Sequence, residues 1–276
     1  MACGLLGCFL ILRKMAMVGD AISHAVLPGI VIAFLISGSR DSFEMIAGAA
    51  ILGLITSFLI EFFHSRAKLQ TDAAIGVTFT WLFALGVILI SLFAGQVDLD
   101  QECVLYGEIA YIPLDLWILD SGTIMGPRAM YVAIAILSIV SLFILLFYRY
   151  INITSFDSAF ASTIGISAAV WHYLLMGMVS MTTVSAFDSV GAILVVALFV
   201  VSPATAYMLT KKLKHMLLLT CAFAVFNSIA GYWLASQLNS SIAGAIVTIS
   251  GLVFTITFLF SPTEGVLVKK WRSKTA

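Results

Sequence analysis

The segment Met17-Val-Gly-Asp-Ala-Ile-Ser-His-Ala-Val-Leu-Pro-Gly-Ile-Val-Ile-Ala-Phe-Leu-Ile36 contains one acidic residue, no Lys or Arg, and otherwise mostly apolar side chains. About 20 apolar residues in a helix span the hydrocarbon core of a bilayer, so the segment predicts a membrane-spanning helix. Asp20 and His24 are four residues apart, which places both side chains on one helical face. A carboxylate inside a membrane is costly and therefore indicates a function. The pair predicts half of a site for a divalent transition metal.

The whole chain has the same apolar character. Of its 276 residues, 62% are hydrophobic and 10% are charged, and the mean hydropathy is +1.11. This composition predicts an all-α, polytopic transmembrane helical bundle with about eight or nine spans, in a single domain over residues 1–276. The other apolar runs cover residues 2–12, 43–63, 73–94, 129–148, 167–184, 190–209, 215–234 and 242–260.

The first of these runs is too short for an ordinary span. About a dozen residues reach only about 18 Å along a helix, against a hydrocarbon core of about 30 Å. Either the start of the chain is shortened or this element is half-inserted.

Basic residues indicate the orientation in the membrane. Arg13, Arg66, Arg149 and the cluster 211–214 fall on one side of the predicted spans, which the positive-inside rule makes cytoplasmic. Residues 96–127 then form an external loop that contains acidic residues but no Lys or Arg. The net charge is zero and there is no extended basic patch, so nucleic acid is not an expected partner. The acids of this loop are Asp98, Asp100, Glu102, Glu108, Asp115 and Asp120.

Pro28 and Gly29 follow the ligand pair closely. Proline has no N–H and clashes with the carbonyl four residues earlier, which is that of His24. The sequence therefore predicts a kinked or opened helix, and irregular backbone at membrane depth is tolerated where it lines a protein-buried or water-filled cavity. Gly29 allows a second helix or the transport pathway to approach.

Other interpretations of these residues are weaker. Asp20 and His24 can also form a structural polar pair. Ser23 is next to His24, but adjacent helical residues point about 100° apart and cannot form a nucleophile–base pair, which excludes a catalytic triad. An intramembrane aspartyl protease needs two converging aspartates, and Asp20 with Asp188 fits that pattern poorly. We therefore expect no enzymatic activity.

Two further histidines are expected to have ordinary roles. Glu61 and His64 can share a helical face, but basic residues follow at once, so a solvated helix end is the preferred interpretation. His172 lies beside Trp171 and is expected to anchor the chain at the membrane interface.

The segment 154–165 is less apolar than its neighbours and predicts a short amphipathic helix that ends at a glycine, with Ser155 as its N-cap. Phe156, Phe160 and Ile164 recur at helical spacing. On a cytoplasmic loop such a ridge can fill a groove on a partner, although an ordinary connector fits the pattern equally well.

The sequence has no G-x-x-x-x-G-K-[ST] motif, the P-loop that binds the phosphates of ATP. If transport uses ATP, a partner protein must therefore hydrolyse it. The alternative is a carrier or channel driven by an ion gradient, acting without an ATPase.

Three stretches resemble the permease subunits of ABC-3 family importers, which carry manganese, zinc or iron. The resemblance extends along essentially the whole chain, although family members normally have a longer first helix. The stretches are Leu12-Arg-Lys-Met-Ala-Met-Val-Gly-Asp-Ala-Ile-Ser-His-Ala-Val-Leu-Pro-Gly29, Ser155-Phe-Asp-Ser-Ala-Phe-Ala-Ser-Thr-Ile-Gly-Ile166 and Val190-Gly-Ala-Ile-Leu-Val-Val-Ala-Leu-Phe-Val-Val-Ser-Pro-Ala-Thr-Ala206.

This resemblance implies a type II ABC importer-like permease in the bacterial cytoplasmic (inner) membrane. Its partners would be a second copy of itself, a cytoplasmic ABC ATPase dimer, an extracytoplasmic metal-binding protein and membrane lipid. Asp20 and His24 of both copies would line the pathway, with no cofactor bound by the chain. The transported ion would be Mn²⁺, which Asp98-Leu-Asp-Gln-Glu-Cys-Val-Leu-Tyr-Gly107 favours, or Zn²⁺ or Fe²⁺. The segment 155–166 would contact the ATPase through Phe156, Asp157, Phe160, Ala161 and Gly165.

Overall fold

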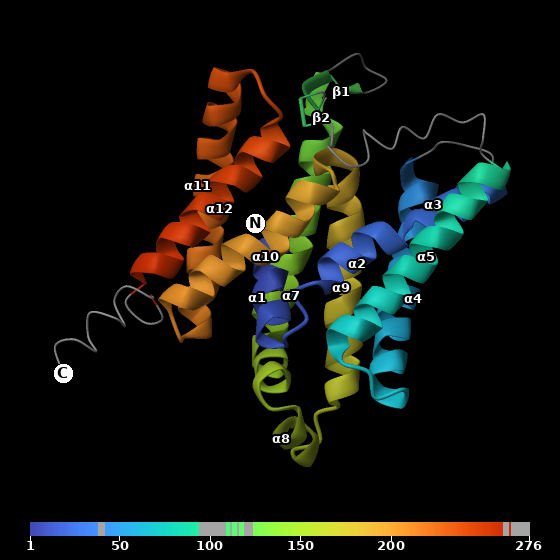
Figure 1. Cartoon of the computed structure of the whole chain (residues 1–276), viewed down its shortest axis with the longest axis vertical. Helices are drawn as coiled ribbons and strands as arrows, with labels where there is room; N and C mark the ends of the chain where they lie inside the picture. Colours follow the sequence, from blue (N-terminus) through green and yellow to red (C-terminus); the bar gives the residue numbers. More distant parts are fainter. Residues whose placement is uncertain are drawn as a thin grey trace.

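A computed structural model describes residues 1–37, 42–93, 109–110, 112–114, 116–118, 124–261 and 265. Within these ranges, eight helical segments are long and apolar enough to cross a membrane. The predicted helical membrane bundle is therefore confirmed (Figure 1). The helices are α1 Ala2–Leu12, α2 Val18–Ala25, α3 Leu27–Ser37, α4 Ser42–Arg66, α5 Thr71–Phe93, α7 Arg128–Phe156, α8 Ser158–Thr163, α9 Ala168–Val190, α10 Ala192–Leu209, α11 Leu213–Leu238 and α12 Ile242–Phe260.

The short first run forms α1, which lies near the centre of the bundle among α7, α9, α10 and α11 (Figure 1). Its side chains Leu6, Phe9 and Leu10 are completely buried. This helix of eleven residues therefore contributes to the protein core and is not one of the eight candidate spans.

The outer helices expose apolar side chains, as a lipid solvent requires. On α7, for example, Leu145 and Leu146 are exposed although they lie in the middle of an apolar helix. Several buried hydroxyls bond to their own helix, as where Thr78 donates to the Ala74 carbonyl (2.7 Å) and Ser250 donates to the Ile246 carbonyl (2.8 Å). These bonds remove the cost of burying polar groups in an apolar bundle.

The short helix α8 marks one end of the molecule, which we call the α8 end. The end of α1 meets the end of α7 there, since Arg13 donates to Ser155. The start of α11 reaches the same level, because Lys214 lies over the ring of Tyr148 on α7. Helix termini from both halves of the sequence thus gather at the α8 end (Figure 1).

The opposite end carries the described part of the predicted acidic loop. It contains a 3-10 turn, η1 (Ile112–Leu114), and an antiparallel hairpin of β1 (Leu116–Ile118) and β2 (Ile124–Pro127). This hairpin is a small departure from the all-α expectation. The ring of Trp117 packs edge-on against Tyr131. The six acids of the predicted loop, together with Arg40 and the basic residues after 268, lie outside the described residues.

Candidate metal-transport site

Helix α2 carries both predicted metal ligands one turn apart. Oδ1 of Asp20 lies 3.5 Å from Nε2 of His24. The side chains are 26% and 31% exposed, respectively, whereas Val18, Ile22 and Ala25 of the same helix are fully buried. The two candidate ligands therefore lie on a face of α2 that the rest of the chain leaves partly uncovered.

The buried face of α2 packs among α4, α5, α9 and α10. Ile22 and Val18 belong to the main hydrophobic core, so the apolar side chains fix the rotation of the helix. Burial of each such side chain stabilises the fold by about 1.5–3 kcal/mol. The packing thus holds the ligand face in one direction.

Aromatic rings of α5 limit the position of His24. The imidazole lies edge-on to Phe83, with ring centroids 5.8 Å apart, and 6.3 Å from Phe79. The hydroxyl of Ser23 points back along its own helix and donates to the Asp20 carbonyl (2.8 Å) and the Gly19 carbonyl (3.1 Å). Ser23 is therefore directed to the backbone and not to His24, in agreement with the exclusion of a triad.

The pair has a geometry that one metal ion can bridge. With metal–ligand bonds of about 2.1 Å, a separation of 3.5 Å corresponds to an angle of about 110° at the ion. In the described part of the chain, no group of three or more His, Cys, Asp or Glu side chains could hold a metal. The described residues therefore offer two candidate ligands here, whereas transition-metal sites contain four or more.

The helix that contains the ligands is interrupted just after them. The structure divides the segment into α2 and α3 at Val26. Gly29 of α3 lies against Gly48 of α4, and a Cβ at position 29 would be 2.5 Å from the Gly48 carbonyl oxygen. The close approach that Gly29 allows is thus occupied by another helix of the same chain.

The segment predicted to couple to a partner forms α8. Asp157 is its N-cap and accepts a bond from the Phe160 N–H at 2.8 Å. The C-terminal end follows the Schellman pattern, with N–H···O bonds from Ile166 to Ala161 (2.9 Å) and from Gly165 to Ser162 (3.2 Å). Gly165 has φ +80°, a conformation that favours glycine.

The apolar ridge of this segment is exposed. The exposed fraction is 63% for Phe156, 54% for Phe160 and 48% for Ile164, whereas Ala161 is fully buried. The ridge thus faces away from the rest of the chain, and the buried Ala161 anchors α8 to it.

Three expectations from the sequence are corrected here. Ser155 is not the N-cap of α8, because α7 continues to Phe156 and Ser155 accepts a bond from Arg13. Glu61 is not simply part of a solvated helix end, since its Oε2 lies 3.4 Å from Nε2 of His172. His172 is not an isolated interfacial anchor, because its Nδ1 also lies 3.3 Å from Nη1 of Arg13. No local sequence pattern indicates this network, because its members are far apart along the chain.

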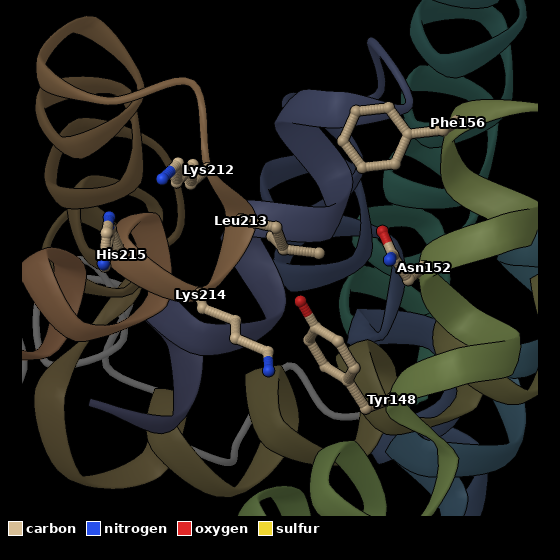
Figure 2. A pocket seen from close by; sticks show the side chains of 7 residues that line it. All are labelled: Tyr148, Asn152, Phe156, Lys212, Leu213, Lys214 and His215. Atoms are coloured by element: carbon tan, nitrogen blue, oxygen red, sulfur yellow. The ribbon is translucent and has the colours of Figure 1, made fainter.

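A cavity of about 450 Å³ lies at the α8 end, between α7 and the start of α11 (Figure 2). Lys212, Lys214 and His215 from the start of α11 line it together with Tyr148 and Asn152 of α7, and Lys214 points toward Tyr148. The Nζ atom of Lys214 is 5.9 Å from the centre of the Tyr148 ring. Two ammonium groups repel a metal cation, so this cavity is not the candidate metal site.

Comparisons with known proteins agree with this arrangement. The model of the ABC 3 transport family matches residues 1–261. The manganese transport system membrane protein MntD of Bacillus subtilis (strain 168) is 47% identical over 272 residues, which cover 99% of this chain and 92% of that protein. The zinc transport system membrane protein TroD of Treponema pallidum (strain Nichols) is 41% identical over 266 residues, which cover 96% of this chain and 72% of that protein.

A solved structure has the same fold. The structure of PsaBC from Streptococcus pneumoniae in complex with Fab matches with a TM-score of 0.78 and 32% identity, covering 98% of this chain and 90% of that chain. The eight long apolar helices of the described residues define a polytopic membrane protein. The chain belongs to the ABC 3 transport family. It is a multi-pass protein of the bacterial cytoplasmic membrane, and its relatives are membrane proteins of metal transport systems.

Proposed function

We propose that this chain is the permease of an ATP-driven importer of divalent transition metals, with manganese as the favoured ion. Its 276 residues act as one transmembrane domain, and Asp20 and His24 bind the ion during passage. The observation that carries the proposal is the position of this pair on the uncovered face of α2, 3.5 Å apart.

A second copy of the chain completes the site. In a two-fold symmetric dimer, each protomer contributes the same surface and therefore the same two side chains. Two carboxylates and two imidazoles then surround one ion, which is a suitable set for Mn²⁺, Fe²⁺ or Zn²⁺. Rocking of the two protomers about their shared axis exposes this site alternately to the two sides of the membrane.

Manganese is preferred because of the relatives. MntD of Bacillus subtilis and the protein MntC of Halalkalibacterium halodurans, 40% identical over 275 residues, are both named for manganese transport. TroD is named for zinc. Asp and His ligands bind both metals, so the ligand types alone do not decide between them.

The α8 end is the cytoplasmic end and the docking site of an ABC ATPase dimer. Basic residues lie in or near the terminal turns of helices at this end, as the positive-inside rule requires. They are Arg13, Arg66, Arg149 and Lys212. The exposed rings of Phe156 and Phe160 fill a groove on the ATPase, while an extracytoplasmic metal-binding protein delivers the ion at the opposite end. Pro28 and Gly29 shape the pathway through the break that follows His24.

Reconstitution tests the class of transporter. Proteoliposomes that contain the chain with its ATPase are expected to accumulate manganese only when ATP is present. Vesicles with the chain alone are expected to show no flux. Manganese flux without the ATPase would favour a gradient-driven carrier or channel and contradict the proposal.

Ligand variants test the site. Asp20→Asn and His24→Gln are expected to abolish uptake, while Asp72→Asn and His215→Gln, on exposed parts of α5 and α11, serve as matched controls. Surface expression of each variant is measured in the same cells. Uptake near the wild-type rate in either ligand variant would remove the assignment of the site.

A further inference from the structure

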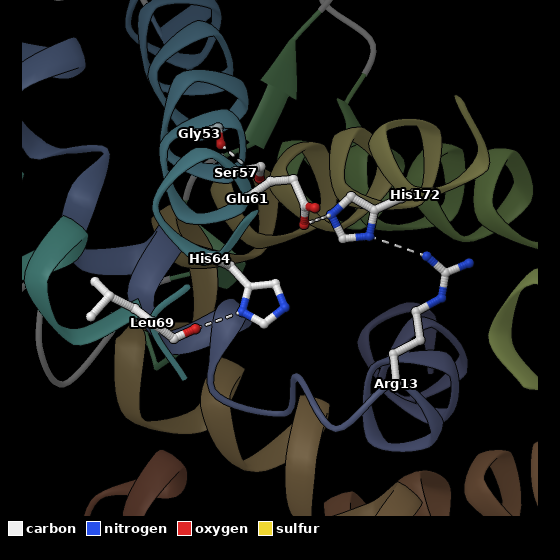
Figure 3. A network of polar contacts seen from close by, with 7 residues as sticks. All are labelled: Arg13, Gly53, Ser57, Glu61, His64, Leu69 and His172. Carbon is white, nitrogen blue, oxygen red and sulfur yellow. Dashed lines mark hydrogen bonds and ion pairs between the residues drawn. The ribbon is translucent and has the colours of Figure 1, made fainter. Parts of the chain in front are cut away.

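Arg13 belongs to a polar network at the α8 end that the proposed site does not use, and Figure 3 shows the part of it that runs from Arg13 through His172 to Glu61. The Nε of Arg13 donates to Oγ of Ser155 (3.0 Å), and its Nη2 donates to Oγ1 of Thr154 (3.1 Å). Its Nη1 lies 3.3 Å from Nδ1 of His172. The remaining ring nitrogen of His172 lies 3.4 Å from Oε2 of Glu61. One guanidinium group is thus connected to α7, α9 and, through an imidazole, α4.

The charges in this network are partly shielded from water. The side chain of His172 is 15% exposed and that of Glu61 is 32% exposed. Burial lowers the pKa of Arg13 to about 10, so the guanidinium remains protonated at neutral pH. The protonated guanidinium donates directional hydrogen bonds to two hydroxyls, and the Glu61 carboxylate lies on the far side of the imidazole. These bonds resist displacement of any one helix.

The position of the network relates it to α8. Thr154 and Ser155 are in the last turn of α7, and Asp157, the N-cap of α8, follows two residues later. A movement of α8 therefore displaces the two hydroxyls that hold Arg13.

A rigid turn connects Arg13 to the candidate site. Its backbone N–H bonds to the carbonyl of Phe9 (3.0 Å), and the Met15 N–H bonds to that of Leu10 (2.9 Å). The Val18 N–H bonds to the Met15 carbonyl (3.2 Å), and α2 begins there. Asp20 lies in the first turn of that helix. The path from Arg13 to the ligand pair is thus short and hydrogen-bonded, with no flexible linker.

We propose that Arg13 is a positioning residue that transmits displacement of α8 to the Asp20–His24 pair, so that ATP hydrolysis and metal release occur together. This inference rests on the proposed function. Arg13 does not touch the ion. It acts through the two hydroxyls on one side and the turn into α2 on the other.

The test measures coupling and not only activity. The permease and its ATPase are reconstituted together, and manganese uptake and phosphate release are measured in the same vesicles. Arg13→Gln is expected to lower the ratio of ions transported to ATP hydrolysed by about tenfold, with hydrolysis itself changed less than about twofold. Arg13→Lys, which keeps the charge and one donor, is expected to restore part of the ratio.

Two further variants make the test decisive. Lys14→Gln removes the same charge from the next, exposed residue and is expected to leave the ratio unchanged. The double variant Thr154→Val with Ser155→Ala removes the acceptors with little change in shape, and it is expected to lower the ratio even if Arg13→Gln does not fold.

An unchanged ratio in Arg13→Gln or in the double variant overturns the inference, as does an equal loss in Lys14→Gln. If the wild-type complex takes up no manganese, the proposed function itself fails. Normal wild-type uptake with an unchanged ratio in the variants removes this inference alone.

Discussion

The Asp20–His24 pair and the Arg13 network lie on either side of one short turn, and they differ in what completes them. Among the described residues, the side chains of Asp20 and His24 contact each other at 3.5 Å, and both remain partly exposed. Arg13 instead has acceptors on two helices, and His172 extends the network to a third. A partly exposed pair of polar groups is open to a further partner, whereas a network that joins several helices holds them together. Loss of the first should reduce transport, and loss of the second should reduce stability and coupling.

The largest expected effect tests whether the two ligands act as one unit. Asp20→Asn and His24→Gln are each expected to lower initial manganese uptake at least about 100-fold, because loss of outer-sphere groups already costs 10–100-fold. The double variant is expected to transport no worse than either single variant, since groups that act together are not additive. Radiolabelled uptake in cells with equal surface expression measures this. Multiplicative losses would show that the two side chains act independently.

The stability of the same variants should show the opposite order. Arg13→Ala is expected to lower the free energy of unfolding by about 1.5–3 kcal/mol, because hydrogen bonds to a charged group are lost and their partners remain partly buried. Asp20→Asn is expected to change it by less than about 0.5 kcal/mol, as for other partly exposed sites. Denaturant unfolding of the detergent-solubilised protein measures both. Lys14→Ala is the control. Equal destabilisation by Arg13→Ala and Asp20→Asn would remove the contrast between the two regions.

The helix that follows the ligand pair gives a third test. Gly29→Ala is expected to destabilise the protein by about 1–3 kcal/mol, because the new methyl group meets the backbone of Gly48. Gly76→Ala is the matched control, since a Cβ there has no atom of another element within 4 Å. That control is expected to be neutral or slightly stabilising. Thermal unfolding of both variants measures the difference, and an equal response would mean that α3 and α4 separate easily.

The smallest expected effect concerns α8. Asp157→Ala removes the N-cap bond to Phe160 and is expected to weaken the helix by about 1 kcal/mol. Binding of the purified ATPase should fall by about fivefold, whereas Asp157→Asn, which keeps a capping oxygen, should bind normally. Titration of the detergent-solubilised permease measures this affinity. Unchanged binding in Asp157→Ala would show that α8 is not preformed for its partner.

Much of the bundle could be predicted from the sequence, because a bilayer requires long apolar helices and hydropathy reports them directly. The predicted run 17–36 and the observed span Val18–Ser37 differ by one residue at each end. The break after His24 occurs where the missing N–H of Pro28 disfavours a continuous helix. The spacing of Asp20 and His24 also gave their shared face, since four residues on any α-helix do so.

The Arg13 network could not be predicted in this way. Arg13 is separated by 142 residues from Ser155 and by 159 from His172, and no helical or strand period reports a contact over such distances. Polar residues near the ends of apolar helices were the available signal, yet Glu61 and His172 individually resemble ordinary interfacial residues. Only the tertiary arrangement of α1, α4, α7 and α9 brings them together.

The two ends of α2 differ in how firmly they are joined to their neighbours. A hydrogen-bonded turn of several residues joins α1 to α2, while a single residue, Val26, separates α2 from α3 and bonds to the backbone of Ile22 and Ile30. Asp20 is six residues from that point, or about 9 Å along a helix. A tilt of about 15° about Val26 would move its carboxylate by roughly 2 Å, which equals the length of a metal–oxygen bond. A small rotation of this one short helix is therefore enough to separate a bound ion from its ligand, if the side chains packed against Val18 and Ile22 move with it.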